Sequence, residues 1–131
     1  MYLLDTNICI YLIREKSPKI EAKFRSHSIT EVGISSITFS ELQFGVEKSQ
    51  YPEKNQEALN FFLAPLEIFP FDERAAIAYG KIRAKLEKQG NVTGPLDLMI
   101  CSHALALYAI LVTNNVKEFP RVKNLKIENW A

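Results

Sequence analysis

The sequence predicts a single α/β domain with a mainly parallel central sheet. Short apolar segments with strand character alternate along the chain with longer segments of helical periodicity, the pattern of repeated βαβ units. The chain has 131 residues, which is enough for one domain with a buried core and too few for two. No internal repeat, low-complexity tract or flexible linker divides it. We therefore expect one domain over residues 1–131.

The first half of the chain opens with a strand. Met1–Leu4 is short and apolar, and Asn7–Arg14 follows as a helix, for which Thr6 or Asn7 is a plausible N-cap. Pro18 suits the first turn of a second helix. A strand, two helices and a strand are then expected, in the order Val32–Ser35, Phe39–Lys48, Glu53–Leu63 and Leu66–Phe69, before Pro70.

The second half contains the clearest helix, Glu73–Gln89. Its core-facing residues recur at spacings of three and four, and Gly90 follows where a glycine commonly ends a helix. After a turn at residues 91–95, a further helix is expected to about Leu107. Two strands complete the chain, Ile110–Thr113 in the buried part of the sheet and Leu125–Ile127 at its edge.

Three carboxylates lie where the sequence is otherwise apolar or turns from strand to helix. Asp5 follows the first strand, Glu41 begins a helical stretch, and Asp97 is the only charge between residues 95 and 116. Functional sites in parallel α/β sheets form beyond the carboxyl ends of the strands, so the fold can bring these side chains together. Converging carboxylates repel one another unless a cation lies between them. This pattern predicts a metal-dependent enzyme.

Each carboxylate also has a purely structural interpretation. Asp5 could cap the helix that follows it, although Thr6 and Asn7 could do so equally well and leave Asp5 free to bind a metal. Glu41 has the spacing from Thr38 of a capping box, and for Glu41 alone that is the better interpretation. Asp97 could interact with a helix dipole, but the helix after it is apolar on nearly all sides. An acid on a buried helix must be paired or metal-bound.

Other site chemistries fit the sequence less well. His27 and His103 have no partner at a metal-ligand spacing, so a zinc site is not expected, and Cys101 and His103 point to different faces of one helix. No glycine-rich phosphate loop is present. Oxygen ligands without histidine or cysteine favour Mg²⁺, with Mn²⁺ as the alternative.

The composition is that of an ordinary globular protein. The chain is 47% hydrophobic and 24% charged with a net charge of +1, which argues against a generally basic nucleic-acid coat. Two cysteines in apolar helical patterns are typical of a reducing cytoplasm, and we expect no signal peptide and no membrane span.

Five segments in order resemble the PIN-domain ribonucleases, and specifically the VapC-type toxins of bacterial toxin–antitoxin pairs. They run from residue 3 to residue 130: Leu3-Leu4-Asp5-Thr6-Asn7, Ile34-Ser35-Ser36-Ile37-Thr38-Phe39-Ser40-Glu41-Leu42, Gly94-Pro95-Leu96-Asp97-Leu98-Met99-Ile100, Leu111-Val112-Thr113-Asn114-Asn115 with Glu118-Phe119, and Glu128-Asn129-Trp130. The resemblance implies a PIN-like α/β/α sandwich that cleaves RNA with Mg²⁺ or Mn²⁺. It also implies a VapB-like antitoxin as partner and a homodimer.

Carried over by motif, Asp5, Glu41 and Asp97 match the acidic metal site of that family. Many relatives have a further acid near Asn115, and the amide here leaves a weaker fourth contact and puts a second metal in doubt. The segments around residues 5 and 114 together look like the subgroup that cuts the anticodon loop of initiator tRNA. The mechanism that we expect is attack by a metal-activated water, which leaves a 5′-phosphate and a 3′-hydroxyl.

Substrate contacts are expected from residues of two kinds. Polar side chains beside the acids, Thr6, Thr113 and Asn114, could contact RNA, and the basic residues Arg83 and Arg121 could contact phosphates, although charged runs are usually solvated faces. Apolar residues of the first helices, with Phe44, Phe61 and Phe62, could form either ordinary core or a groove for an antitoxin segment. A non-catalytic PIN-like module that binds RNA or protein is the alternative function, and the amide at residue 115 is its best support.

Overall fold

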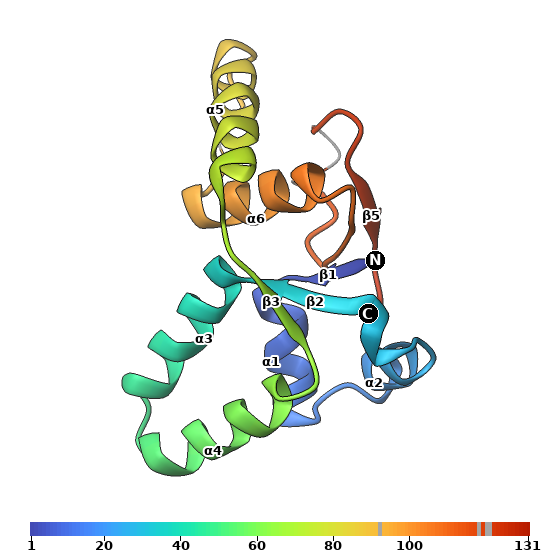
Figure 1. Ribbon diagram of the computed structural model, residues 1–131, viewed down its shortest axis with the longest axis vertical. Coiled ribbons are helices and arrows are strands. Elements are labelled where there is room, and N and C mark those ends of the chain that lie inside the picture. The colour runs from blue at the N-terminus through green and yellow to red at the C-terminus, as the bar shows by residue number, and fades with distance from the viewer. Residues whose placement is uncertain (92, 118, 120–121) are drawn as a thin grey trace.

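A five-stranded sheet in which every pairing is parallel forms the centre of the molecule (Figure 1). The computed structural model describes residues 1–91, 93–117, 119 and 122–131. Along the sheet the strands follow the order β3-β2-β1-β4-β5, which places the first strand of the chain in the middle. Their bounds are β1 Tyr2–Leu4, β2 Val32–Ser35, β3 Glu67–Phe69, β4 Ile110–Val112 and β5 Lys126–Glu128. The predicted parallel α/β class is confirmed.

Six α-helices and one short 3-10 helix are described around this sheet. Pro18, Pro52 and Pro95 each open a helix, where a missing N–H costs nothing because the first turn has no partner for it. Gly90, with φ +74, ends the long helix as predicted. The bounds are α1 Thr6–Arg14, α2 Pro18–Arg25, η1 Ile29–Glu31, α3 Ser36–Glu47, α4 Pro52–Leu63, α5 Glu73–Lys88 and α6 Pro95–Ala106.

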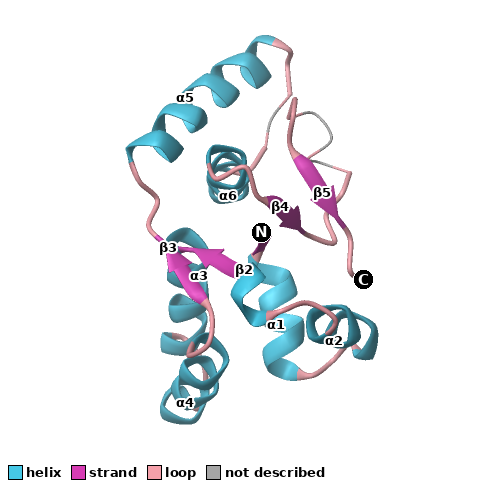
Figure 2. Ribbon diagram, turned by 45° about the vertical axis from the view of Figure 1, so that its right-hand side comes forward, coloured by secondary structure: helices cyan, strands magenta, loops and turns pink. Residues whose placement is uncertain are grey.

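The helices cover both faces of the sheet and form an α/β/α sandwich. Successive residues of β1 face opposite ways: Leu4 is buried in a core cluster with residues of α1 to α4, and Leu3 in a second cluster with α6. Helix α5 packs on α6 rather than on the sheet itself, as Figure 2 shows where α5 crosses above the end-on view of α6. No helix in the described part of the chain is long and apolar enough to cross a membrane.

Two helix starts differ from the sequence-based expectation, and both lie at the carboxyl edge of the sheet. Asp5, not Thr6 or Asn7, caps α1, because its Oδ1 accepts a hydrogen bond from the Ile8 N–H at 2.9 Å. Helix α3 begins at Ser36 rather than Phe39, because the Ser35 hydroxyl accepts from the Ile37 N–H at 3.1 Å. The Thr38–Glu41 capping box is therefore absent, and Glu41 lies in the second turn of α3.

Candidate active site

Asp5 occupies the centre of the candidate site because β1 is the middle strand. The Asp5 N–H donates to the Val112 carbonyl at 3.0 Å, so the residue leaves the sheet beside the end of β4. Its side chain is 8% exposed. Burial raises the pKa of this carboxyl, repulsion from Asp97 and Glu41 raises it further, and hydrogen bonds from the Thr113 hydroxyl and the Ile8 N–H oppose the rise. Asp5 is thus both the helix cap and a charge that the fold does not fully compensate.

Glu41 and Asp97 approach Asp5 from the helices on opposite faces of the sheet. Glu41, on α3, accepts a hydrogen bond from the Thr6 hydroxyl at 2.6 Å, which ties it to the first turn of α1. Asp97 lies in the first turn of α6, where the partial positive charge of the helix end favours a carboxylate. Both side chains are half-buried. Because each contributes to the rise in the Asp5 pKa, the structure brings the three predicted carboxylates into one electrostatic group.

The three carboxylates have the right ligand atoms for a hard divalent cation, but they are not yet close enough together to bind one. Their donors are carboxylate oxygens, the ligands that Mg²⁺ and Mn²⁺ prefer, and Asp5 and Glu41 take part in neither ion pair among the described residues. However, among those residues no three His, Cys, Asp or Glu side chains are positioned to hold a metal ion. A cation would therefore have to draw these carboxylates together. Asp5, Glu41 and Asp97 therefore fit a divalent cation once their side chains have moved closer together.

Thr113 supports Asp5 from the end of β4. Its side chain is fully buried, its hydroxyl donates to the Asp5 carboxylate, and its Oγ1 accepts from the Asn115 N–H at 3.0 Å. A buried side chain offers no surface to a substrate, so the expected RNA contact of Thr113 is replaced by a role in orienting Asp5. Asn114 and Asn115 are half-buried in the following loop, at the same edge of the sheet as Asp5.

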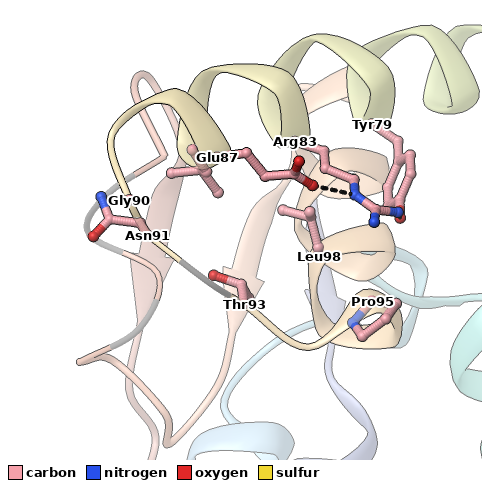
Figure 3. A pocket seen from close by; sticks show the side chains of 9 residues that line it. Tyr79, Arg83, Glu87, Gly90, Asn91, Thr93, Pro95 and Leu98 are labelled. Carbon is pink, nitrogen blue, oxygen red and sulfur yellow. Dashed lines mark hydrogen bonds and ion pairs between the residues drawn. The ribbon is translucent and has the colours of Figure 1, made fainter.

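Arg83, one of the two predicted arginines, makes its hydrogen bonds within its own helix. Arg83 lies on α5, where its guanidinium donates to the Tyr79 hydroxyl at 2.9 Å and to Glu87 at 2.8 Å (Figure 3). These hydrogen bonds raise the pKa of Arg83 and hold it at a pocket of about 470 Å³ between the end of α5 and the start of α6. Arg121 lies outside the described residues.

An apolar groove of about 840 Å³ begins beside Thr6 and Glu41 and runs between α1, α3, α4 and α6. We call it the α1–α3 groove, and among the residues that line it are Asn7, Ile10, Ile13, Phe44, Leu96 and Met99. Phe44 is 63% exposed and Leu96 48% exposed. Sequence reasoning considered Phe44 and the apolar residues of the first helices, to which Ile13 belongs, as either core or groove residues. It missed Leu96 and Met99, which flank Asp97 and looked like part of a fully buried helix.

Comparison with known proteins places the chain in a family. Residues 2–125 match the model of the PIN domain. Ribonuclease VapC2 of Rickettsia felis is 46% identical over 134 residues, covering 99% of this chain and 98% of that protein. The tRNA(fMet)-specific endonuclease VapC of Shigella flexneri is 42% identical over 130 residues, with the same coverage. The crystal structure of Rickettsia felis VapBC2 bound to a promoter DNA fragment has a chain that superposes with a TM-score of 0.94, at 44% identity over 99% of this chain and 98% of that one.

Proposed function

The chain belongs to the PIN-domain family, in its VapC group, and on that basis we propose that it is a divalent-metal-dependent endoribonuclease toxin whose site is formed by Asp5, Glu41 and Asp97. The observation that carries the proposal is the repulsion between carboxylates at the carboxyl edge of the sheet. Burial raises the pKa of Asp5 there, and the charges of Asp97 and Glu41 raise it further. A fold that needed no cation there would gain nothing from this repulsion.

Asp5, Asp97 and Glu41 are the residues that would hold the cation, and Mg²⁺ is our proposal for its identity. When bound, a divalent cation lowers the pKa of a water molecule and offsets negative charge on the phosphate oxygens. The protein's own part is orientation: the Ile8 N–H and the Thr113 hydroxyl fix the Asp5 carboxylate, and the Thr6 hydroxyl holds Glu41. In-line attack by water breaks the bond to the leaving ribose oxygen and leaves a 5′-phosphate and a 3′-hydroxyl.

We propose tRNA as the substrate, with the initiator tRNA as the first to test. The support is the relative from Shigella flexneri, which is named a tRNA(fMet)-specific endonuclease and is aligned over nearly the whole chain. The names of the relatives also favour catalysis over a non-catalytic PIN-like module. Asn115 would then supply a neutral polar contact to the phosphate or to a water, where an acid would add a fourth negative charge.

The α1–α3 groove is the proposed site of the antitoxin partner. Its apolar walls suit an amphipathic segment, and its acidic end at Glu41 suits a basic side chain on that segment. The similar structure from Rickettsia felis is a VapBC complex. A Phe44→Asp substitution should release co-expressed antitoxin in a pull-down assay, and retention of the antitoxin at the wild-type level would place its binding elsewhere. We expect the toxin to form a homodimer within the complex.

The test of the nuclease proposal is cleavage of purified tRNA by antitoxin-free protein with Mg²⁺, with Mn²⁺ and with EDTA. Discrete cuts should occur with metal, disappear with EDTA, and disappear in an Asp97→Asn variant. A Glu73→Gln variant is the matched control, because it removes one exposed carboxylate from the first turn of another helix. Sequencing of the fragment ends should show 5′-phosphates. Ends with 2′,3′-cyclic phosphate would reject attack by water, and cleavage in EDTA would reject the metal.

A further inference from the structure

One buried hydrogen bond connects the two helices that carry Glu41 and Asp97. His103 Nδ1, on α6, lies 2.7 Å from the Ser35 hydroxyl oxygen at the end of β2, and the two residues are 68 positions apart in the sequence. Ser35 is fully buried and His103 is 1% exposed. This pair could not be predicted from the sequence, because His103 has no partner at a spacing typical of metal or nucleophile sites.

Ser35 occupies a position equivalent to that of Asp5 on the neighbouring strand. Leu3 pairs with Gly33 in the parallel register of β1 and β2, so Ser35 and Asp5 each stand two residues further on, at the carboxyl edge. The Ser35 hydroxyl also accepts the Ile37 N–H and thereby fixes where α3 begins. A single oxygen atom therefore joins the start of α3 to the body of α6.

The remaining surroundings of His103 restrict its ring. The Phe71 ring lies edge-on to it at 5.4 Å and 80°, and the Phe71 N–H donates to the Ser36 hydroxyl at 2.9 Å. Burial lowers the pKa of His103, while the charge of Asp72 opposes this, so the imidazole is held toward its neutral form. A neutral imidazole has one donor and one acceptor nitrogen, so the bond between Nδ1 and the Ser35 hydroxyl is directional in either tautomer.

We propose that His103 is a positioning residue for RNA cleavage: through Ser35 it fixes α3 against α6 and so sets the distance between the Glu41 and Asp97 carboxylates. The inference rests on the proposed nuclease function. Glu41 lies six residues after Ser35 on α3, and Asp97 lies six residues before His103 on α6, so a shift at this bond moves the two acids relative to each other. A buried polar pair adds little net stability over an apolar pair of the same shape. We therefore expect the bond between His103 and Ser35 to affect the geometry of the site more than the stability of the fold.

The experiment compares tRNA cleavage by His103→Leu, His103→Asn and Ser35→Ala variants with the wild-type protein. His103→Leu and Ser35→Ala each remove one side of the bond and should lower kcat about ten- to a hundredfold with little change in KM. The asparagine side chain places an amide where Nδ1 stands, so His103→Asn should recover most of kcat. A calorimetric Mn²⁺ titration should show weaker binding to His103→Leu, without depending on turnover.

Ser102→Ala is the matched control. Ser102 is fully buried on the same helix, and its hydroxyl donates to the Leu98 carbonyl at 2.7 Å, so the variant disturbs α6 without touching the link to α3. Its kcat should stay near the wild-type value. All variants are assayed at a temperature at which circular dichroism shows them folded, and Ser35→Ala carries the test if His103→Leu does not fold.

Three outcomes would overturn the inference: an unchanged kcat in folded His103→Leu or Ser35→Ala, an equal loss in Ser102→Ala, or no recovery in His103→Asn. Failure of the wild-type protein to cleave any RNA would instead overturn the proposed function, so the two failures are distinguishable.

Discussion

Replacing Asp5 by asparagine should abolish cleavage and at the same time stabilise the metal-free protein at neutral pH. The Asp5 carboxyl is buried beside two other acids, and its pKa is raised above the ordinary value of 3.8. Such a group stabilises the fold when protonated, and this contribution is lost as the pH rises through its pKa in the folded state. Asparagine resembles the protonated form at every pH. Its amide oxygen can still accept the Ile8 N–H, so α1 keeps its cap.

The comparison with Asp5→Ala supplies a magnitude. Alanine also removes the charge, but it loses the cap, which costs about 1 kcal/mol. For a domain of this size, a difference of that order shifts the melting temperature by about 4 °C. At neutral pH in EDTA, Asp5→Asn should therefore be more stable than the wild-type protein. It should also be more stable than Asp5→Ala, by about 1 kcal/mol.

Urea unfolding followed by circular dichroism at pH 7.5 and at pH 5 measures these differences. EDTA is required because a cation that binds the folded wild-type protein would stabilise it by mass action. The advantage of Asp5→Asn over wild type should shrink as the pH is lowered toward 3.8. An asparagine variant less stable than wild type at pH 7.5 would refute the electrostatic reasoning, and equal stability of the asparagine and alanine variants would refute the capping role.

Three further predictions concern the scaffold. Gly33→Ala should lower the free energy of unfolding by about 1–3 kcal/mol in a urea titration, because a Cβ would lie 2.6 Å from the Phe69 ring and 2.9 Å from the Glu67 carbonyl oxygen; no loss would mean that β3 and the ring can both move aside. Because the pKa of His103 is lowered, the wild-type protein should lose stability as the pH falls below about 6.5, and His103→Asn should flatten this dependence between pH 5 and 8. Urea unfolding at each pH measures this, and an equal pH dependence of the unfolding free energy in the two proteins would assign the titration to another group. Trp130→Phe should lose about 1 kcal/mol with the indole N–H bond to Glu128 and a further packing contribution, because Trp130 is fully buried in the core. Thermal melting measures the loss, and a Glu128→Gln variant, which keeps an acceptor, should lose less.

Much of the fold was predictable because its signals are local. Apolar runs, helical spacing, and proline or glycine at helix ends located all five strands and six helices of the described structure, mostly within a few residues. The largest error was the start of α3. There the apolar pattern begins at Phe39, but the helix begins where the Ser35 hydroxyl caps it. A serine next to another serine gives no indication of which one will cap.

The sequence was enough to predict which acids form the candidate site, but not which hydrogen bonds hold them. Asp5 and Asp97 stood out as charges in apolar surroundings, and strand ends in a parallel sheet lie at one edge. That Thr6 holds Glu41 and that Thr113 is buried against Asp5 follow from contacts between segments far apart in the chain. The cap on α1 is a local bond from the Ile8 N–H to Asp5, but three consecutive residues of the sequence could each have formed it.

The sequence by itself determined the α/β class, the strand-end positions of the acids and the oxygen chemistry of the site. These depend on hydrophobic periodicity and on residue type, which are properties of short segments. Only the tertiary structure decided which hydroxyl orients which carboxylate, and that His103 is bonded to Ser35 across the core. Hydrogen bonds form over about 3 Å, so their partners are fixed only when packing brings distant segments to that separation.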